Sequence, residues 1–299
     1  MTFNRYIFFA IMAAVLYAIS TPVSKLLLNS LSPVYIAALL YLGAGFGMLM
    51  VWRIRKRTSF HEPMHFSKRE LPAVFGMVIL DIIAPILLMI GLMTSNPENV
   101  ALLNNFEIVA TSLFAFFIFK EAIPGRLRLA IVLVTIASII LSVEDAQAFK
   151  FSAGSLLVLL ATVSWGLENN FTRKLSFNDP LVVVVIKGLF SGLGSLIIAF
   201  ALGDVVWMPE MILITMLLGF VAYGLSIFFY VTAQRELGAA KTSTFYAFAP
   251  FVGAFLSLLI FREIPQVNFF IALIFMALGS YFASTDWKNK EASKDYSTE

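Results

Sequence analysis

The sequence contains no cysteine, only two histidines and few charged residues. Without cysteine, the chain cannot form a disulfide, a thiolate metal site or a cysteine-based redox centre. Charged residues make up 13% of the 299 positions and apolar residues 60%, whereas soluble domains are about a quarter charged and about half apolar. The composition therefore indicates a protein that spans a membrane.

Ten apolar runs are long enough to cross a bilayer, because its hydrocarbon core of about 30 Å takes roughly 20 helical residues. The runs do not alternate between apolar and polar residues as barrel strands do, so we predict helices. Most breaks between the runs carry turn residues, such as Asn96-Pro97 and Pro124-Gly125. We predict an all-α membrane protein with ten transmembrane helices at 6–28, 33–52, 71–93, 98–119, 127–144, 152–172, 180–202, 210–233, 239–261 and 266–285.

Basic residues are distributed unevenly among the connections. With the N-terminus in the cytoplasm, Lys25, Lys150 and Arg262 lie on the outer side and nearly all other Lys and Arg residues on the inner side. The positive-inside rule then predicts that both termini are cytoplasmic. We interpret the first run as a transmembrane helix and not as a signal peptide, since it lacks a convincing cleavage site. We expect the protein to lie in a bacterial inner membrane. The polar segment 287–299 is expected to be a disordered cytoplasmic tail.

The two halves of the chain carry similar motifs. Lys120-Glu121-Ala-Ile-Pro124 follows the fourth run, and Arg262-Glu263-Ile-Pro265 follows the ninth. Because each half has an odd number of spans, the second half must enter the membrane from the opposite face. We therefore predict two inverted five-helix repeats, 1–148 and 149–286. Inverted repeats are typical of alternating-access transporters, with a substrate site near the midplane between the halves.

With these motifs, the sequence resembles the drug/metabolite transporter superfamily in its ten-helix EamA form, over nearly the whole chain to about residue 286. The resemblance rests on two basic–Glu pairs, two mid-helix motifs and a glycine in the last span: Lys120-Glu121, Arg262-Glu263, Glu107-Ile108-Val109, Ala249-Pro250-Phe251 and Gly279. The chain departs from the family pattern at Ile108, where proline is usual, and at Ser138, where glycine is frequent. The resemblance implies transport of a small metabolite, more often outward, without naming the cargo.

Four ionisable residues lie deep in the expected spans, namely Asp81, Glu107, Glu168 and Lys187. Each is a candidate for function, because charges inside a membrane are costly. Three acids and one base favour a cationic or amine-bearing substrate, or protons that replace it. Lys187 can pair with Glu168, extend to the interface or bind a substrate carboxylate, and Glu168 can instead pair with Arg173. These alternatives stay open at the level of sequence.

Amide and aromatic residues accompany the four charges. Asn104 lies on nearly the same helix face as Glu107, and Tyr17 and Trp165 occupy matching positions in the two halves. Aromatic rings attract an ammonium group by ~0.5–2 kcal/mol per contact, although core or lipid-facing rings would have the same composition. The predicted substrate-binding residues are Asp81, Glu107, Asn104, Trp165, Glu168, Lys187, Tyr17, Tyr223 and Tyr246, and the predicted structural or gating residues are Glu121, Glu263 and Pro250.

Two further patterns bear on function. His61-Glu62-Pro63-Met64-His65 fits a zinc-protease pattern, but Pro63 separates the histidines in a short loop, so we expect no metal, no cofactor and no enzymatic activity. Gly43-Ala-Gly45-Phe-Gly47 and Gly188-Leu-Phe-Ser-Gly192-Leu-Gly194 follow no strand, so we interpret them as faces for close helix packing rather than phosphate-binding loops.

The leading hypothesis is a secondary active transporter that moves a small amine-bearing metabolite, an amino acid or a related cationic compound, by alternating access and as an exporter. An importer of choline-like or other cationic metabolites stays open, as does a channel or a lipid scramblase. The expected partners are a small-molecule substrate, the lipid bilayer and protons as coupling ion, with no nucleic acid. The sequence does not predict the oligomeric state.

Overall fold

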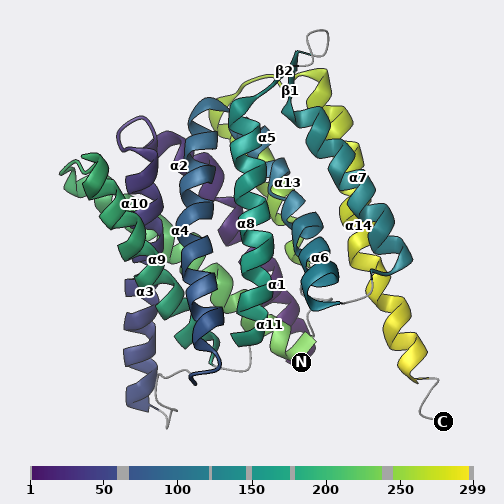
Figure 1. Ribbon diagram of the computed structural model, residues 1–299, viewed down its shortest axis with the longest axis horizontal. Helices are drawn as coiled ribbons and strands as arrows, with labels where there is room; N and C mark the ends of the chain where they lie inside the picture. Colours follow the sequence, from purple (N-terminus) through teal and green to yellow (C-terminus); the bar gives the residue numbers. More distant parts are fainter. Residues whose placement is uncertain are drawn as a thin grey trace.

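The computed structural model is a bundle of helices that run along a common direction (Figure 1). It describes residues 2–58, 67–120, 123–145, 150–175, 179–237 and 245–295. In chain order, the helices are α1 (Thr2–Ala18), α2 (Ser20–Leu27), α3 (Pro33–Thr58), α4 (Leu71–Thr94), α5 (Pro97–Leu103), α6 (Phe106–Phe119), α7 (Gly125–Ser142), α8 (Ala153–Leu175), α9 (Pro180–Leu202), α10 (Pro209–Gly219), the π-helix η1 (Phe220–Leu225), α11 (Ser226–Leu237), α13 (Ala249–Phe261) and α14 (Val267–Asp295). Two short strands, β1 (Val143–Asp145) and β2 (Lys150–Phe151), form an antiparallel pair between α7 and α8.

Among the described residues, seven helical segments are long and apolar enough to cross a membrane, and α13 and the apolar part of α14 are shorter apolar helices. The helix α8 is as long as the others but carries the polar run Glu168, Asn169 and Asn170, which lowers its hydropathy. Together these segments make up the ten-helix, all-α membrane fold that the sequence predicts, so that prediction is confirmed.

Two of the predicted helices, 6–28 and 98–119, each form one span, Arg5–Leu27 and Pro97–Ile118, and each span contains a local break in the regular helical hydrogen bonding. Between α1 and α2 the break lies at Ile19, because Pro22 has no N–H to offer the carbonyl of Ala18. Between α5 and α6 the break lies at Asn104–Asn105, where two poor helix formers stand together. Each interruption leaves backbone groups without their regular helical partners near the middle of the bundle.

Some boundaries differ from the expected ones. The predicted helix 210–233 contains the π-helical turn η1, a feature that is frequent at functional sites. The predicted helix 239–261 begins in a part of the chain outside the described residues, and α13 begins at Ala249. The helix α14 continues to Asp295, so most of the segment 287–299 that we expected to be disordered is helical. Its Lys, Glu and Ala residues are strong helix formers.

The helices of the first half pack on those of the second half. Packing partners across the two halves include α3 with α9, α4 with α8, α7 with α14, α1 with α11 and α5 with α13. Taken in chain order, the counterparts are α1–α2 and α8, α3 and α9, α4 and α10–α11, α5–α6 and α13, and α7 and α14. Replacing each helix by its counterpart reproduces the same set of pairs, because the pair α4–α8 becomes the pair α1–α11 and the reverse. The packing therefore has the two-fold symmetry expected of a repeat.

The basic–Glu signatures have the same backbone role in both halves. Lys120 ends α6 with a φ of 58° and Arg262 ends α13 with a φ of 54°, both in the left-handed region. A left-handed residue at this position is a common way to end a helix, although glycine usually fills it. The two motifs thus mark equivalent helix ends.

Glycines allow α3 and α9 to approach closely, as the sequence predicts. A Cβ atom at Gly45 would lie 2.5 Å from the backbone nitrogen of Leu189, and one at Gly192 would lie 2.6 Å from that of Leu42. A Cβ atom at Gly188 would collide with the backbone of Gly45. These contacts hold the two helices, one from each half, at a distance that larger residues would not permit.

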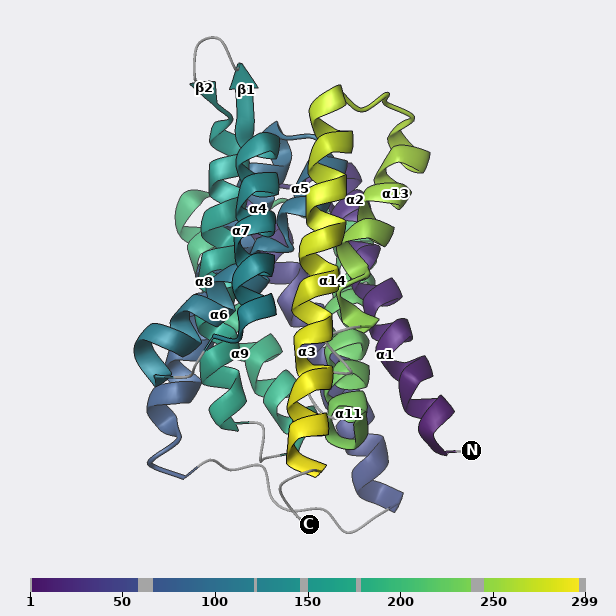
Figure 2. The same ribbon diagram turned by 90° about the vertical axis from the view of Figure 1, so that its right-hand side faces the viewer.

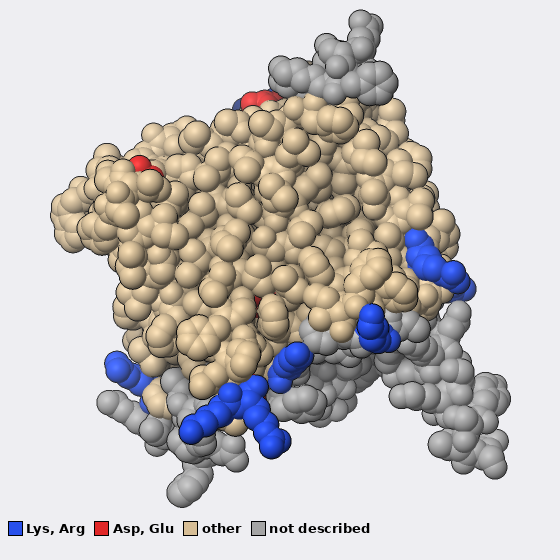
Figure 3. All heavy atoms as spheres, in the orientation of Figure 1, with Lys and Arg blue, Asp and Glu red and all other residues tan. Residues whose placement is uncertain are grey.

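The beginning of α1 and the end of α14 lie at the same end of the bundle, and the paired strands lie at the opposite end (Figures 1 and 2). On the face in Figure 3, most visible Lys and Arg side chains lie towards the end with the termini. The broad middle zone of that face shows few charged side chains. Large apolar residues of the spans, such as Ile197 and Phe200 of α9, are exposed. An apolar zone bounded by charged ends is typical of a surface in contact with lipid.

Candidate functional site

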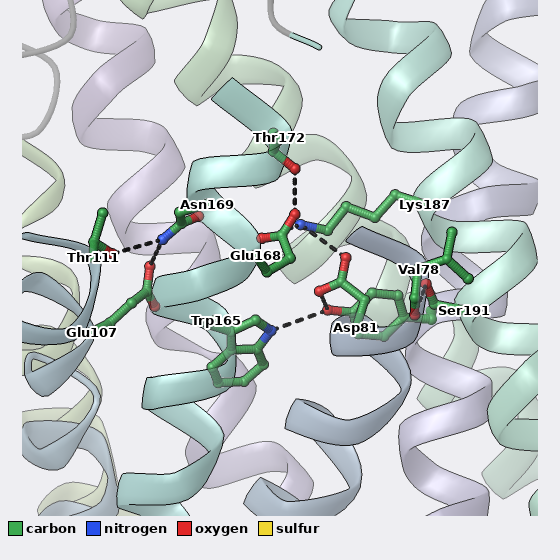
Figure 4. A network of polar contacts seen from close by, with 11 residues as sticks. Val78, Asp81, Glu107, Thr111, Trp165, Glu168, Asn169, Thr172, Lys187 and Ser191 are labelled. Atoms are coloured by element: carbon green, nitrogen blue, oxygen red, sulfur yellow. Dashed lines mark hydrogen bonds and ion pairs between the residues drawn. The ribbon is translucent and has the colours of Figure 1, made fainter. Parts of the chain in front are cut away.

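Three of the four predicted membrane charges form one buried cluster, the Asp81–Glu168–Lys187 triad (Figure 4). Asp81 is on α4, Glu168 on α8 and Lys187 on α9. The Lys187 Nζ atom lies 3.1 Å from Asp81 Oδ2 and 3.0 Å from Glu168 Oε2. Their relative exposures are 0% for Asp81, 1% for Glu168 and 8% for Lys187. One ammonium group therefore joins two carboxylates from different helices across the two halves.

Polar neighbours fix the orientation of the two carboxylates. The Tyr41 hydroxyl, on α3, donates a hydrogen bond of 2.8 Å to Asp81 Oδ1, and the indole N–H of Trp165 donates one of 3.4 Å to the Tyr41 oxygen. The Thr172 hydroxyl, one turn after Glu168, donates to Glu168 Oε1. Hydrogen bonds to charged groups contribute about 1.5–3 kcal/mol each, so the triad is held by more than its ion pairs.

The fourth predicted charge, Glu107, lies in a separate polar group (Figure 4). It is in the first turn of α6, just after the helix break. The Asn169 side-chain amide donates a hydrogen bond of 2.6 Å to Glu107 Oε1 and one of 3.4 Å to the Thr111 hydroxyl. In the described part of the chain, no salt bridge joins Glu107 to a basic side chain. Its carboxylate is thus bonded by an amide and has no counter-ion there.

A chain of tyrosine rings connects the two groups. The ring of Tyr223, in η1, lies 5.4 Å from that of Tyr41 and 5.9 Å from that of Tyr17. The Tyr17 ring lies 5.8 Å from Tyr246, which lies 4.9 Å from Tyr230. Tyr17 and Tyr246 lie within electrostatic range of Glu107. The aromatic cluster therefore extends from the triad towards Glu107.

A small cavity lies where the interrupted helices meet. Its volume of about 10 Å³ has room for roughly one water molecule. It is lined by residues of α1, α2, α5 and α13 and of the breaks beside them: Tyr17, Ala18, Thr21, Ala101, Asn104, Ala249, Pro250 and Gly253. Asn104 is 7% exposed, and its side-chain oxygen accepts no hydrogen bond in this structure. The cavity thus presents an unused acceptor beside an aromatic ring.

The structure brings all nine predicted substrate-binding residues into these two neighbouring groups. Trp165 and Tyr223 adjoin the triad, while Asn104, Tyr17 and Tyr246 accompany Glu107. Of the three predicted structural or gating residues, Pro250 begins α13 and lines the cavity. Glu263 is exposed after the end of α13 and interacts electrostatically with Lys25. Glu121 lies outside the described residues, as do the histidines of the 61–65 motif.

Four members of the site are absent from the predicted set. Asn169 was detectable, because it stands next to Glu168 in the sequence. Thr172 was detectable, because it follows Glu168 by four residues on the same helix face. Thr111 was detectable in the same way from Glu107. Tyr41 carried no signal, since its partner Asp81 is 40 residues away on another helix. In the described residues no group of three or more His, Cys, Asp or Glu side chains is placed to hold a metal ion.

Comparison with known proteins identifies the class. The model of the EamA-like transporter family matches residues 4–143 and 152–285, so it covers both halves of the chain. The protein therefore belongs to the EamA-like transporter family, within the drug/metabolite transporter superfamily. It is an integral membrane transporter.

Individual relatives agree with this assignment. An uncharacterized transporter of Methanothermobacter thermautotrophicus is 26% identical over 289 residues, covering 91% of this chain and 83% of the relative. An uncharacterized transporter of Clostridium kluyveri is 25% identical over 182 residues, 58% of each chain. A solved structure described as "Crystal structure of protein" superposes with a TM-score of 0.67 at 16% identity, covering 93% of this chain and 95% of the other. At this low identity, the superposition supports the fold alone.

Proposed function

We propose that the protein transports a small amine-bearing metabolite, an amino acid or a related cationic compound, and that Glu107 binds its ammonium group. The observation that carries the proposal is the environment of this carboxylate. It receives a hydrogen bond from Asn169 while Lys187 pairs with the other two acids. Among the described residues Glu107 thus has no ion-pair partner, which leaves its carboxyl group open to a cation from outside the protein.

The surroundings of Glu107 suit such a cation. The neighbouring rings of Tyr17 and Tyr246 lie within electrostatic range of Glu107, and an ammonium group gains about 0.5–2 kcal/mol from each ring that it contacts. The oxygen of Asn104 is available to accept a hydrogen bond from an N–H group. The present cavity is too small for a metabolite, so binding requires the surrounding helix segments to separate. The interrupted helices supply the points at which they can move.

Transport then follows by alternating access, with the two inverted halves (1–148 and 149–286) moving around the midplane site. We place the end that carries both termini in the cytoplasm, because most basic residues of the connections lie there, and we expect a bacterial inner membrane. Export is the direction that the sequence resemblance favours. Efflux from cells loaded with the transported compound, measured against cells without the protein, tests this direction.

A thermal-shift screen of the detergent-purified protein tests the substrate class. The probes are L-threonine, L-lysine, choline and succinate. A ligand at about 100 times its Kd adds roughly 2.7 kcal/mol to the free energy of unfolding. We expect stabilisation by amine-bearing probes, its loss in Glu107→Gln, and its retention in Glu210→Gln, which makes the same change at an exposed position of α10. Stabilisation by succinate alone would overturn the proposal and point to Lys187.

A further inference from the structure

The Asp81–Glu168–Lys187 triad has an unbalanced formal charge. Two carboxylates face one ammonium group, which leaves a charge of −1 if all three groups are ionised. At most 8% of any of these residues is exposed. Burying an uncompensated charge costs several kcal/mol, whereas a neutral set that is fully bonded does not carry that penalty. The triad therefore favours the uptake of one positive charge.

Among the residues whose side chains the structure describes, the other charged or titratable groups around the triad do not supply that charge. Asp81 faces Tyr41 from α3 and Tyr223 from η1, besides its two partners in the triad. Glu107, on α6, acts on the triad electrostatically but carries the same sign as the excess. The four carboxylate oxygens are also unequal. Asp81 Oδ1 and Glu168 Oε1 accept hydrogen bonds from Tyr41 and Thr172, whereas Asp81 Oδ2 and Glu168 Oε2 both face the Lys187 ammonium group, at 3.1 Å and 3.0 Å. Asp81 Oδ2 is buried and makes no hydrogen bond beyond this ion pair.

We propose that the Asp81–Glu168–Lys187 triad is a proton-binding site, separate from the amine site at Glu107, and that Asp81 holds the proton. A proton from solvent neutralises Asp81 and leaves Glu168 and Lys187 as a balanced pair. The tyrosine chain Tyr41–Tyr223–Tyr17 connects this site to the cavity. The role of the triad as the coupling site of a transporter rests on the proposed function. The binding of the proton by Asp81 does not.

Trp165 is a built-in reporter for this proton. Its indole N–H donates to the Tyr41 oxygen, and the Tyr41 hydroxyl donates to Asp81. Loss of the negative charge on Asp81 weakens the second bond and changes the polarity around the indole. The chain has four tryptophans, so replacing the other three by phenylalanine at 52, 207 and 287 leaves Trp165 as the sole emitter.

The experiment is a pH titration of Trp165 fluorescence in this single-tryptophan protein. We expect a transition that fits one proton, its loss in Asp81→Asn, and its retention in Glu107→Gln. Asparagine has nearly the size of aspartate, and the variant keeps the neutral Glu168–Lys187 pair, so the fold should persist. A transition that survives Asp81→Asn, or the absence of any transition in the parent, would overturn the proposal.

Infrared difference spectroscopy of the otherwise unaltered protein gives a second test that needs no substitution. Protein labelled with ¹³C at the aspartate carboxyl should show a protonated acid band that shifts with the label and persists at pH values where exposed carboxylates are ionised. The absence of a labelled band would contradict the proposal. If the fluorescence titration or the infrared experiment detects the proton while none of the amine probes stabilises the protein, the proton site stands and the proposed substrate class fails. The reverse pattern would retain the amine site and remove the proton site.

Discussion

Asp81 and Glu107 are both acids near the middle of a membrane-spanning helix, yet their surroundings differ. Asp81 is fully buried, ion-paired to Lys187 and hydrogen-bonded by Tyr41. Glu107 is only partly buried, adjoins a helix break and is bonded by the neutral amide of Asn169. Asp81 thus belongs to an ionic cluster, whereas Glu107 has no counter-ion among the described residues.

The difference separates two roles that sequence alone assigns to both residues. A carboxylate already paired inside the protein cannot bind a substrate cation unless it first loses its partner. A carboxyl group that is held in position by an amide, without an ion-pair partner among the described residues, is open to a ligand. The triad joins α4, α8 and α9, whereas the Glu107 group lies at the breaks between α1 and α2 and between α5 and α6.

Removing the ammonium group from the triad should have the largest effect on stability. Lys187→Met leaves two carboxylates facing each other in a buried site, and breaking a buried pair in this way costs about 3–5 kcal/mol. We expect a lower unfolding midpoint in detergent, measured by circular dichroism against denaturant.

Two controls sharpen this prediction. Lys68→Met removes a basic residue from an exposed position and should leave the midpoint unchanged. Adding Asp81→Asn and Glu168→Gln to Lys187→Met removes the stranded charges and should restore most of the stability. If the triple variant is no more stable than Lys187→Met, the ion pairs are not what the lysine contributes.

The Tyr41 hydroxyl should have the next largest effect. Tyr41→Phe removes the donor to Asp81 Oδ1 and the acceptor for Trp165, and losing a hydrogen bond to a charged group costs about 1.5–3 kcal/mol. The Trp165 emission should shift as its N–H loses its partner. Tyr230→Phe, at the far end of the tyrosine chain, provides the matched control and should leave that emission unchanged. An unaltered spectrum in Tyr41→Phe would contradict the Trp165–Tyr41–Asp81 connection.

A change in packing should disturb the triad without altering its charges. Gly188 follows Lys187 and contacts the backbone of Gly45 on α3. A methyl group at this position would push α9 away, and overpacking of this kind costs about 1–3 kcal/mol. Denaturant unfolding of Gly188→Ala measures the loss.

Gly125→Ala is the matched control for Gly188→Ala, because its nearest surroundings are the end of the Arg128 side chain at 3.8 Å. Equal stability losses in the two variants would show that the close approach of α3 and α9 does not matter.

The sequence predicts the number of spans and the repeat because both follow from strong local signals. Long apolar runs need no tertiary information, and the Lys120 and Arg262 motifs recur at equivalent helix ends. The helix break at Asn104–Asn105 is weaker in sequence, since both residues also occur inside helices. The sequence could not predict that Asp81, Glu168 and Lys187 form one cluster while Glu107 lies apart from them. The pairing of Lys187 with Asp81 joins residues that are 106 positions apart (187 − 81), and nothing near Asp81 in the sequence indicates a basic partner.

Neutralising Glu107 should change stability least. Glu107→Gln keeps an oxygen that can accept the hydrogen bond from Asn169 and strands no opposite charge, so we expect a change below about 1 kcal/mol. The same denaturant measurement, made beside Lys187→Met in one detergent, tests the contrast directly. A loss as large as that of Lys187→Met would mean that Glu107 is itself part of a structural ion pair. A small loss combined with the disappearance of stabilisation by amine probes would place the function of this carboxylate in binding rather than in folding.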